Sequence, residues 1–446
     1  MAGIHRHDRR YDIKPSSGPR TPGQRDRDRL LYSSAFRRLA GITQVVSPAE
    51  GQIFHNRLTH VLKVAQIGRR LAEKHLAEKD GEKIANALGG LDPDVVEAAG
   101  IAHDLGHPPF GHVAEEELDA LVKAQGVTDG FEGNAQSFRI VTKLAMRVSG
   151  VEGLDLTRAT LNAILKYPWF RGAGGGKKER KWGAYNTERE DFEWARKLYP
   201  HDERKSLEAE IMDWADDIAY SVCDMEDFYR AGKIPLDRLT ARQASNPFTA
   251  EAERFLVEVQ SRWERQERNI KNFTPYQSAF LNLINFLPIC EPYNGSTDQR
   301  ANLRNVTSTL IGRYMNAIKL NKSAKSNQPR VIIADWAVTE VNILKELTWH
   351  YVINDPALAN QQCGYRRVIR ELFQTFLEAT EHEEHWKMFP IGSRELLEEL
   401  KNPHQKKAER VRIVVDLIAG LSEQQALEMY QRLTGISFGS MLRAIV

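Results

Sequence analysis

The chain is poor in cysteine and lacks long apolar runs. Only three of its 446 residues are cysteines, and they stand far apart at Cys223, Cys290 and Cys363. An odd number of widely spaced cysteines argues against a disulfide framework and a thiolate metal site, so a reducing cytoplasm fits best. No stretch approaches the ~18 apolar residues of a membrane span, and the charged start MAGIHRHDRR has no apolar segment typical of an export signal. We therefore expect a soluble cytoplasmic protein that does not bind membranes.

The chain also lacks a strong charge of either sign. Lys and Arg number 62 against 60 Asp and Glu, which leaves a formal net charge of +2. No global field draws such a protein onto nucleic acid or membrane, so any anion site has to be built locally. The glycine run GAGGGKKE is not a P-loop, because it lacks the G-x-x-x-x-G-K-[ST] order. HEEH at 382–385 likewise lacks the H-E-x-x-H order of a zinc site.

Apolar residues at three- and four-residue spacing predict helices from about residue 30 onward. Val61, Val64 and Ile67 illustrate this spacing within the segment 57–79. The strict alternation typical of strands is rare, although RVIIADWAV at 330–338 fits a helix and a short strand equally well. We therefore predict an almost all-α protein.

Composition divides the chain into three parts. Residues 1–29 are rich in Arg, Asp, Pro and Gly, so we expect a basic N-terminal arm that is ordered only where it packs on a neighbour. Residues 30–235 form a helical core, and residues 236–446 form a helical C-terminal region that packs on this core and takes part in assembly. A basic glycine-rich loop at 171–183 and a short linker at 245–249 interrupt the helical pattern.

The strongest local chemical signal is the pair His103-Asp104 at the start of HDLGHPPFGH. The segment 94–105 is expected to be a helix, which places the pair in its last turn. Two prolines then end this helix before another begins at about His112. An imidazole and a carboxylate in one turn can both reach a divalent metal that accepts nitrogen and oxygen ligands. Taken alone, however, such a pair is more often a helix cap with a surface ion pair.

Two further segments offer polar side chains on faces otherwise fit for burial. His60 falls on the apolar face of its predicted helix, where an imidazole needs a partner or a metal. The segment 209–227 places Asp216, Tyr220 and Asp224 at i, i+4 and i+8 along one helix stripe. A satisfied core histidine and a solvated acidic face are the simpler interpretations of each feature alone.

Together these segments resemble the bacterial deoxynucleoside triphosphate triphosphohydrolase (dGTPase-like) family of the HD superfamily. The similar segments are HNRLTH at 55–60, HDLGHPPFGHVAEEE at 103–117, residues 209–227, SAFRRLAGITQV at 34–45 and FEGNAQSFRIV at 131–141. The resemblance covers about residues 30–230, so the C-terminal half is included only by association. The fold it implies is an all-α HD-domain fold with additional C-terminal helices, in which residues 30–235 are the phosphohydrolase core.

The resemblance implies a metal site with two histidine and two aspartate ligands. These would be His60, His103, Asp104 and Asp216. Asp216 is preferred because Tyr220 follows it by four residues, as in the family, and Asp217 is the reserve. The ion would be Mn²⁺ or Mg²⁺, with other transition metals as alternatives. Open positions on such an ion make bound water more acidic and polarise a phosphate oxygen.

The implied reaction is attack at the α-phosphorus of a dNTP, which releases the deoxynucleoside and tripolyphosphate, with dGTP among the expected substrates. His112 and Glu115 match the family's catalytic histidine and the acid that orients it. The substrate-binding candidates are Gln44 at the sugar 3′-hydroxyl, Arg57 near the base or α-phosphate, Tyr220 against the deoxyribose, Asp224, and Lys166. Lys177, Lys178 and Arg180 in the basic loop are further phosphate candidates, although ordinary solvated charge explains them equally well. Gly133 departs from the family, where a histidine often approaches the phosphates.

Two alternatives stay open. The first is another HD phosphohydrolase, which would act on dNMPs, cyclic dinucleotides or guanosine polyphosphates. The second is a regulatory single-stranded nucleic-acid-binding protein on an HD fold, which would use the basic arm and the segment 401–412 on DNA phosphates. The resemblance also implies a homo-oligomer, dimeric or hexameric, and a dNTP that acts as allosteric activator.

Overall fold

The computed structural model describes most of the chain. The described residues are 4–11, 13, 18–45, 54–172, 176–199, 202–240, 247–266, 272–325, 328–400 and 406–437. They are predominantly helical, with one two-stranded sheet, so the predicted all-α fold is confirmed. Parts of the N-terminal arm, the basic loop, the 245–249 linker and the 401–412 segment lie outside the described residues.

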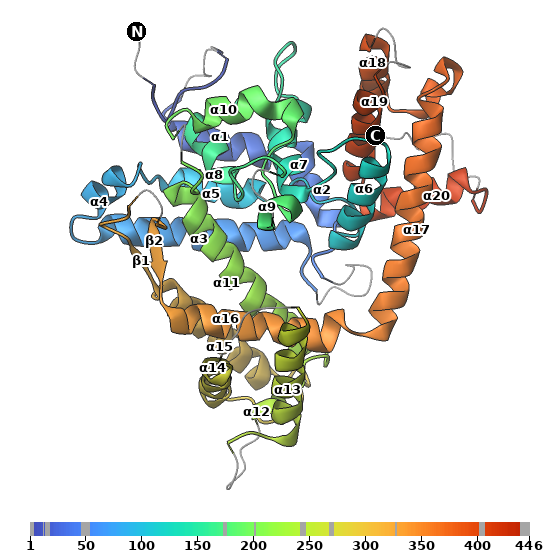
Figure 1. Cartoon of the computed structure of the whole chain (residues 1–446). Coiled ribbons are helices and arrows are strands. Elements are labelled where there is room, and N and C mark those ends of the chain that lie inside the picture. The colour runs from blue at the N-terminus through green and yellow to red at the C-terminus, as the bar shows by residue number, and fades with distance from the viewer. Residues whose placement is uncertain are drawn as a thin grey trace.

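Three capped helices form the centre of the molecule. They are α3 (Arg57–Ala77), α5 (Pro93–Ala102) and α11 (Leu207–Arg230). The side chains of Asn56, Asp92 and Ser206 accept backbone N–H groups at their three N-termini, which satisfies donors that a helix otherwise leaves unpaired. In Figure 1, α11 crosses α3, and all three helices pack on one another. The apolar face predicted for 57–79 is buried in this packing.

Shorter helices surround this centre. They are α1 (Pro22–Leu31), α2 (Ser34–Arg38), α4 (Gly81–Ala87), α6 (His112–Ala124), α7 (Gly133–Arg139), α8 (Arg158–Ile164), α9 (Lys177–Arg180) and α10 (Arg189–Arg196). The helical body therefore begins at Pro22, inside the segment expected to be an arm. Residues 4–11 also lie against the body, because Arg6 pairs with Glu208 and the Arg158 N–H donates to the Asp8 carbonyl over 2.9 Å.

The C-terminal region forms a lower lobe and then turns back toward the centre. Its helices are α12 (Leu236–Thr240), α13 (Ala250–Arg265), α14 (Thr274–Phe286), α15 (Thr297–Met315), α16 (Asp335–Thr348), α17 (Pro356–Ala379), α18 (Ile391–Glu399), α19 (Lys407–Ala419) and α20 (Glu423–Leu433). The antiparallel strands β1 (Ile318–Leu320) and β2 (Val331–Ile333) precede α16. The ambiguous segment 330–338 thus contains a strand followed by a helix start. Figure 1 shows the long α17 leading from the lobe to α18–α20 beside α6.

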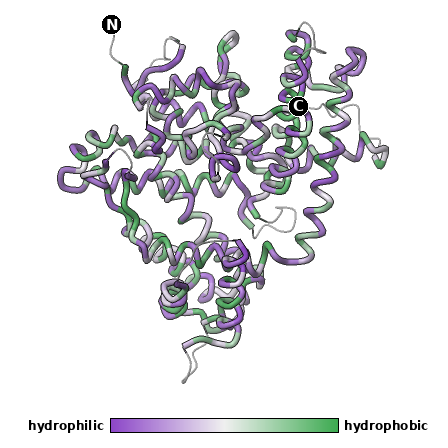
Figure 2. The backbone as a smooth tube through the Cα atoms, viewed as in Figure 1, coloured by the Kyte–Doolittle hydropathy of each residue, from purple (hydrophilic) through white to green (hydrophobic). Residues whose placement is uncertain are grey.

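Two large apolar cores hold most of these elements in the described part of the chain. The larger core runs from Leu30 in α1 through the three central helices to Val352 after α16. The second joins α6 to α17 and α19 through Leu118, Phe373 and Val414. Figure 2 shows hydrophobic and hydrophilic residues mixed along the helices, and none of the described helices is both long enough and apolar enough to cross a membrane. The second core matters for the site, because α6 carries His112.

Candidate active site

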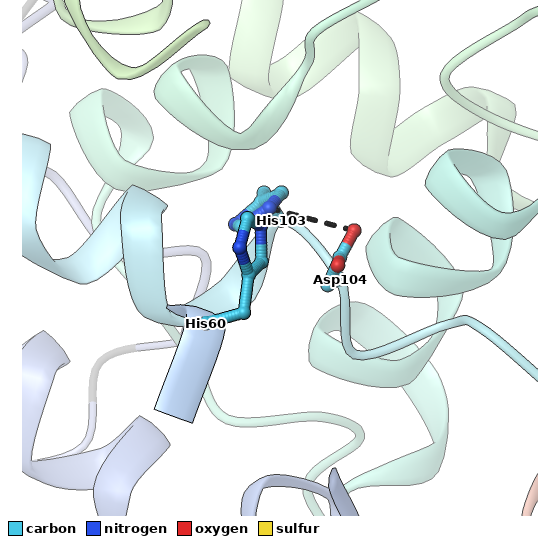
Figure 3. Close-up of side chains that lie close together, drawn as sticks. All are labelled: His60, His103 and Asp104. Carbon is cyan, nitrogen blue, oxygen red and sulfur yellow. Dashed lines mark ion pairs between the residues drawn. The ribbon is translucent and has the colours of Figure 1, made fainter. Parts of the chain in front are cut away.

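Two helices bring His60, His103 and Asp104 together. Their ligand atoms all lie within 4.8 Å of one another, and all three residues are buried. Figure 3 shows His60 rising from α3 toward the pair at the end of α5. The helix α5 ends at Ala102, earlier than the predicted residue 105, so His103 is its C-cap and Asp104 lies just beyond it. This turn places both side chains at the mouth of one cavity.

The helix α11 adds Asp216 to this cluster. Its Oδ1 lies 3.0 Å from His60 Nε2 and 3.7 Å from His103 Nε2. The neighbouring Asp217 instead accepts from Lys345 of α16 over 2.6 Å. Burial alone would raise the pKa of Asp216, but Lys166 and the two histidines hold it well below its usual range. The structure thus gathers the four sequence-predicted ligands and turns the reserve candidate toward another partner.

The donor set fits a divalent metal. His103 Nδ1 lies 2.7 Å from the Gly100 carbonyl, which can only accept, so Nδ1 carries the ring proton. His103 Nε2 is left as an acceptor, and it is buried without a hydrogen-bond partner among the residues that the structure describes. An imidazole fixed in this tautomer by a backbone carbonyl is the usual arrangement of a metal ligand. Two imidazoles and two carboxylates could therefore hold a divalent cation here.

Two cations offset the charge of these carboxylates. Lys166 Nζ lies 2.7 Å from Asp216 Oδ2 and 2.8 Å from Asp213 Oδ1, and Arg57 pairs with Asp104. Burial opposes the charge of Lys166, but Asp213 and Asp216 raise its pKa well above the usual value. Lys166 therefore stays charged at the edge of the cavity, where an anionic group of a ligand would meet it.

A hydrogen-bonded histidine–glutamate pair lies beside the cluster. His112 begins α6, and its Nδ1 is 2.8 Å from Glu115 Oε2, as the i, i+3 spacing predicts. Lys181 Nζ lies 2.8 Å from Glu115 Oε1, and the Gly133 N–H donates to the same oxygen over 3.2 Å. Burial alone would raise the pKa of Glu115, but His112 and Lys181 hold it well below its usual range. Glu115 is therefore a carboxylate that orients the imidazole.

His107 is a site residue that the sequence analysis missed. It is buried between the two groups, with Nδ1 3.2 Å from Asp104 Oδ1 and its ring centroid 5.3 Å from that of His112. Burial and the Arg57 charge lower its pKa to about 3. A Cβ added to Gly133 would lie 3.3 Å from the His107 ring, so this ring fills the space beside the glycine. The signal was present, because His107 stands inside HDLGHPPFGH.

Most of these groups line one cavity of about 510 Å³. The sequence-predicted residues on its wall are Gln44, Arg57, His60, His103, Asp104, His112, Lys166, Asp216, the reserve ligand Asp217 and Tyr220. The opposite wall comes from the C-terminal region, which the sequence analysis did not connect to the site: Ile353, Leu358, Gln361, Gln362, Tyr365 and Arg366. A His/Asp cluster that could hold a metal, the His112 imidazole and fixed cations thus share one volume of ligand size.

Five sequence-predicted candidates, Glu115 among them, do not belong to this wall. Asp224 is wholly buried and lies 3.1 Å from His55 Nε2, so its carboxylate faces away from the cavity. Lys177 and Lys178 lie over the rings of Tyr167 and Trp169. Neither lysine nor Arg180 belongs to the cavity lining. Lys181, one residue further along, is the cation of the basic loop that reaches the site.

Comparison with known proteins matches both halves of the chain. Residues 57–221 match the HD domain, and residues 331–432 match a phosphohydrolase-associated domain. Several relatives carry the name deoxyguanosinetriphosphate triphosphohydrolase-like protein, and three of them illustrate the similarity. The one from Streptomyces coelicolor is 36% identical, over 96% of this chain and 96% of the relative. Those from Corynebacterium efficiens (35% identical, 94% and 92%) and Caulobacter sp. (31% identical, 94% and 91%) are similar over nearly the same extent.

Proposed function

Since the chain belongs to the deoxyguanosinetriphosphate triphosphohydrolase-like family of HD-domain phosphohydrolases, we propose that it hydrolyses dNTPs, dGTP among them, to the deoxynucleoside and tripolyphosphate. Family membership confirms the resemblance that HDLGHPPFGH indicates. The observation that carries the proposal is the single cavity that holds both the buried His/Asp cluster and the His112 imidazole.

The ligands of the metal in this proposal are His60, His103, Asp104 and Asp216, and the ion is Mn²⁺ or Mg²⁺. When bound, such an ion supplies Lewis-acid polarisation of a phosphate oxygen and a more acidic water. Lys166 and Arg57, which offset the carboxylates, would turn part of their charge toward the triphosphate. The wall therefore provides fixed positive charge where negative charge develops during phosphoryl transfer.

The proton transfers in this proposal belong to His112. Glu115 accepts from Nδ1–H, which directs Nε2 toward the cavity and stabilises the protonated ring. Nε2 can then pass a proton to the 5′-oxygen that leaves with the deoxynucleoside. Tyr220 and Gln44 lie on the same wall, which supports their roles against the deoxyribose and at its 3′-hydroxyl. Asp224 is left out of this set because it faces His55.

The broader expectations also enter the proposal. We propose a homo-oligomer and a dNTP activator, as the resemblance implies. A cytoplasmic location is supported by the three cysteines, which are all free. The division into an arm (1–29), an HD core (30–235) and a C-terminal assembly region (236–446) is retained as a working description.

The test is product analysis. The purified protein is incubated with Mn²⁺ and, separately, each dNTP, each rNTP and the dNTP mixture, and products are resolved by ion-pair chromatography. We expect the deoxynucleoside and tripolyphosphate from dNTPs alone and no turnover by Asp104→Ala. The appearance of dNMP or dNDP would contradict the proposal in favour of another HD phosphohydrolase. Absence of turnover with salt-sensitive binding of single-stranded DNA would favour the regulatory alternative.

A further inference from the structure

A buried carboxylate from the C-terminal region joins two segments of the cavity wall. Glu423 is the first residue of α20 and is 7% exposed. Its Oε1 accepts from the backbone N–H of Thr43 over 2.7 Å and from that of Phe110 over 3.1 Å. Thr43 directly precedes Gln44, and Phe110 lies two residues before His112. One oxygen atom therefore joins the segments that present these two cavity residues.

The turn that leads from Asp104 to α6 is also held by a cation. Arg38 donates to the carbonyl of Leu105 over 2.6 Å, to that of His107 over 2.9 Å and to that of Leu421 over 3.2 Å. Its guanidinium thus ties carbonyls of the HDLGHPPFGH turn to the start of α20, while Glu423 ties an amide of that turn to the same place. The Arg38 guanidinium satisfies backbone carbonyls and the Glu423 carboxylate satisfies backbone amides where this turn meets the start of α20.

The turn needs such support because its backbone is unfavourable. Phe110 has φ +67° and Gly111 has φ +61°, and a left-handed conformation is uncommon for an aromatic residue. The Phe110 ring stacks on Tyr365 of α17, with centroids 4.3 Å apart and planes 8° from parallel. Since α6 starts directly after this turn, the direction of the His112 side chain depends on how the turn is held.

Gln44 lies on the other segment that Glu423 holds, next to Thr43. Its amide oxygen is buried and has no hydrogen-bond partner within the described part of the chain, although its side chain lines the cavity. A buried acceptor without a protein partner is costly unless a ligand meets it. Its aim depends on the backbone of Thr43, which the Glu423 carboxylate holds.

We propose that Glu423 is a positioning residue for the catalytic cavity, which it serves by holding the Thr43 and Phe110 amides so that Gln44 and His112 face one substrate. The contact itself is independent of the reaction, and only its kinetic consequence rests on the proposed function. The proposed metal ligands His60 and His103 lie in α3 and at the C-cap of α5, and neither is among the groups that bond to Glu423 Oε1. The C-terminal region is therefore part of the catalytic unit and not only of its assembly.

The experiment compares three variants of the full chain. Glu423→Ala removes the acceptor, and Glu423→Gln keeps an oxygen at the same position. Glu428→Ala is the matched control on the same helix, where the Glu428 carboxylate accepts from the side-chain amide of Gln424. Peptide-resolved hydrogen exchange should speed up at residues 41–45 and 108–112 in Glu423→Ala only. Its kcat should fall at least about 10-fold, while Glu423→Gln stays within about threefold, and Mn²⁺ stoichiometry should be unchanged in all variants.

Each contrary result would overturn the inference. Unchanged hydrogen exchange at both segments in Glu423→Ala would show that the contact does not hold them. Faster exchange over the whole chain would show that Glu423 contributes only to overall stability. Raised local exchange with an unchanged kcat would remove the positioning role. Should Glu423→Ala not fold, Glu423→Asp withdraws the oxygen by one methylene and should raise exchange at the same two segments. If the wild type turns over no dNTP, the exchange data still decide the contact, so the two proposals fail separately.

Discussion

Asp216 and Asp217 are neighbours on α11, yet their carboxylates meet different partners. Asp216 faces the two histidines and Lys166, whereas Asp217 faces Lys345 of the C-terminal region. Adjacent helix positions differ by about 100° in direction, so the two carboxylates reach different partners although both residues line the cavity. The preference for Asp216, which the resemblance supplied through Tyr220, agrees with this geometry.

These neighbours provide a matched pair of substitutions. Asp216→Asn should lower the affinity for Mn²⁺ and reduce turnover at least about 100-fold, because it removes one charged ligand. Asp217→Asn should keep metal affinity within a few-fold of the wild type. Calorimetric titration of Mn²⁺ and steady-state kinetics measure both effects. Equal losses in the two variants would contradict the assignment of Asp216.

At the scale of elements, the junction of α3 and α5 sets the distance between the two histidines. A Cβ added at Gly100 of α5 would lie 2.7 Å from Cα of Ala65 in α3, so the helices meet backbone to backbone. Both helices are otherwise lined by buried apolar residues. The close approach therefore depends on one residue without a side chain.

We expect Gly100→Ala to lower the free energy of unfolding by about 1–3 kcal/mol, because the added methyl group forces the helices apart. It should also weaken Mn²⁺ binding through the displaced His60. The control is Gly312→Ala in α15, where nothing lies within 4 Å of the added atom. That change should be neutral or stabilising by up to about 1 kcal/mol. Urea unfolding distinguishes the two, and a stable Gly100→Ala would refute the close packing.

The segment before α3 is tied to α11 by a charged histidine. Burial opposes the charge of His55, but Asp224 and Asp227 raise its pKa to about 9. The folded pKa exceeds the unfolded value of 6.5, so the stability that this contact adds is complete below about pH 6.5 and is lost as the pH rises through 9. His55→Gln should therefore destabilise the protein clearly at pH 6 and little at pH 10. Urea titrations at both values measure this, and a pH-independent difference would contradict the charged pair.

Element boundaries show where sequence patterns succeed and fail. The apolar spacing of α3 and the prolines that precede α6 are local features, so they are visible in the sequence. The start of α1 at Pro22 is hidden, because half of its ten residues are charged and its Asp26 is buried against Arg9 of the arm. The orientation of Asp224 is hidden in the same way, because its spacing places it on the helix stripe of Tyr220 but does not reveal that it pairs with His55. In both cases a partner from a distant segment determines the structure, and sequence spacing does not show that partner.

At the scale of the whole molecule, the site has two walls from separate parts of the chain. The motif residues form one wall, and α17 supplies the other with Gln362 and Tyr365 among its residues. No chemical signature marks the α17 side chains in the sequence, and only the return of the chain brings them to the cavity. The metal-binding wall was therefore predictable, and the opposite wall was not.

A cavity made in α17 should also destabilise α6, because both helices pack in the second core. Phe373 is 1% exposed and packs in the core shared by α6, α17 and α19. Phe373→Ala should cost about 3–5 kcal/mol of unfolding free energy and speed up hydrogen exchange in α6. Phe286→Ala, at a phenylalanine that is 40% exposed, is the matched control and should cost far less. Unchanged exchange in α6 would show that the two regions are independent.

The pairing of Asp104 with Arg57 and of Asp216 with Lys166 has a practical consequence. A site whose carboxylates already have cationic partners keeps no uncompensated buried charge when the ion leaves. Binding of the ion is then separable from folding. Chelation should therefore abolish activity without unfolding the protein, and different ions can be exchanged into one preformed pocket. The same polypeptide can therefore serve as its own reference when the chemistry of one ion is compared with that of another.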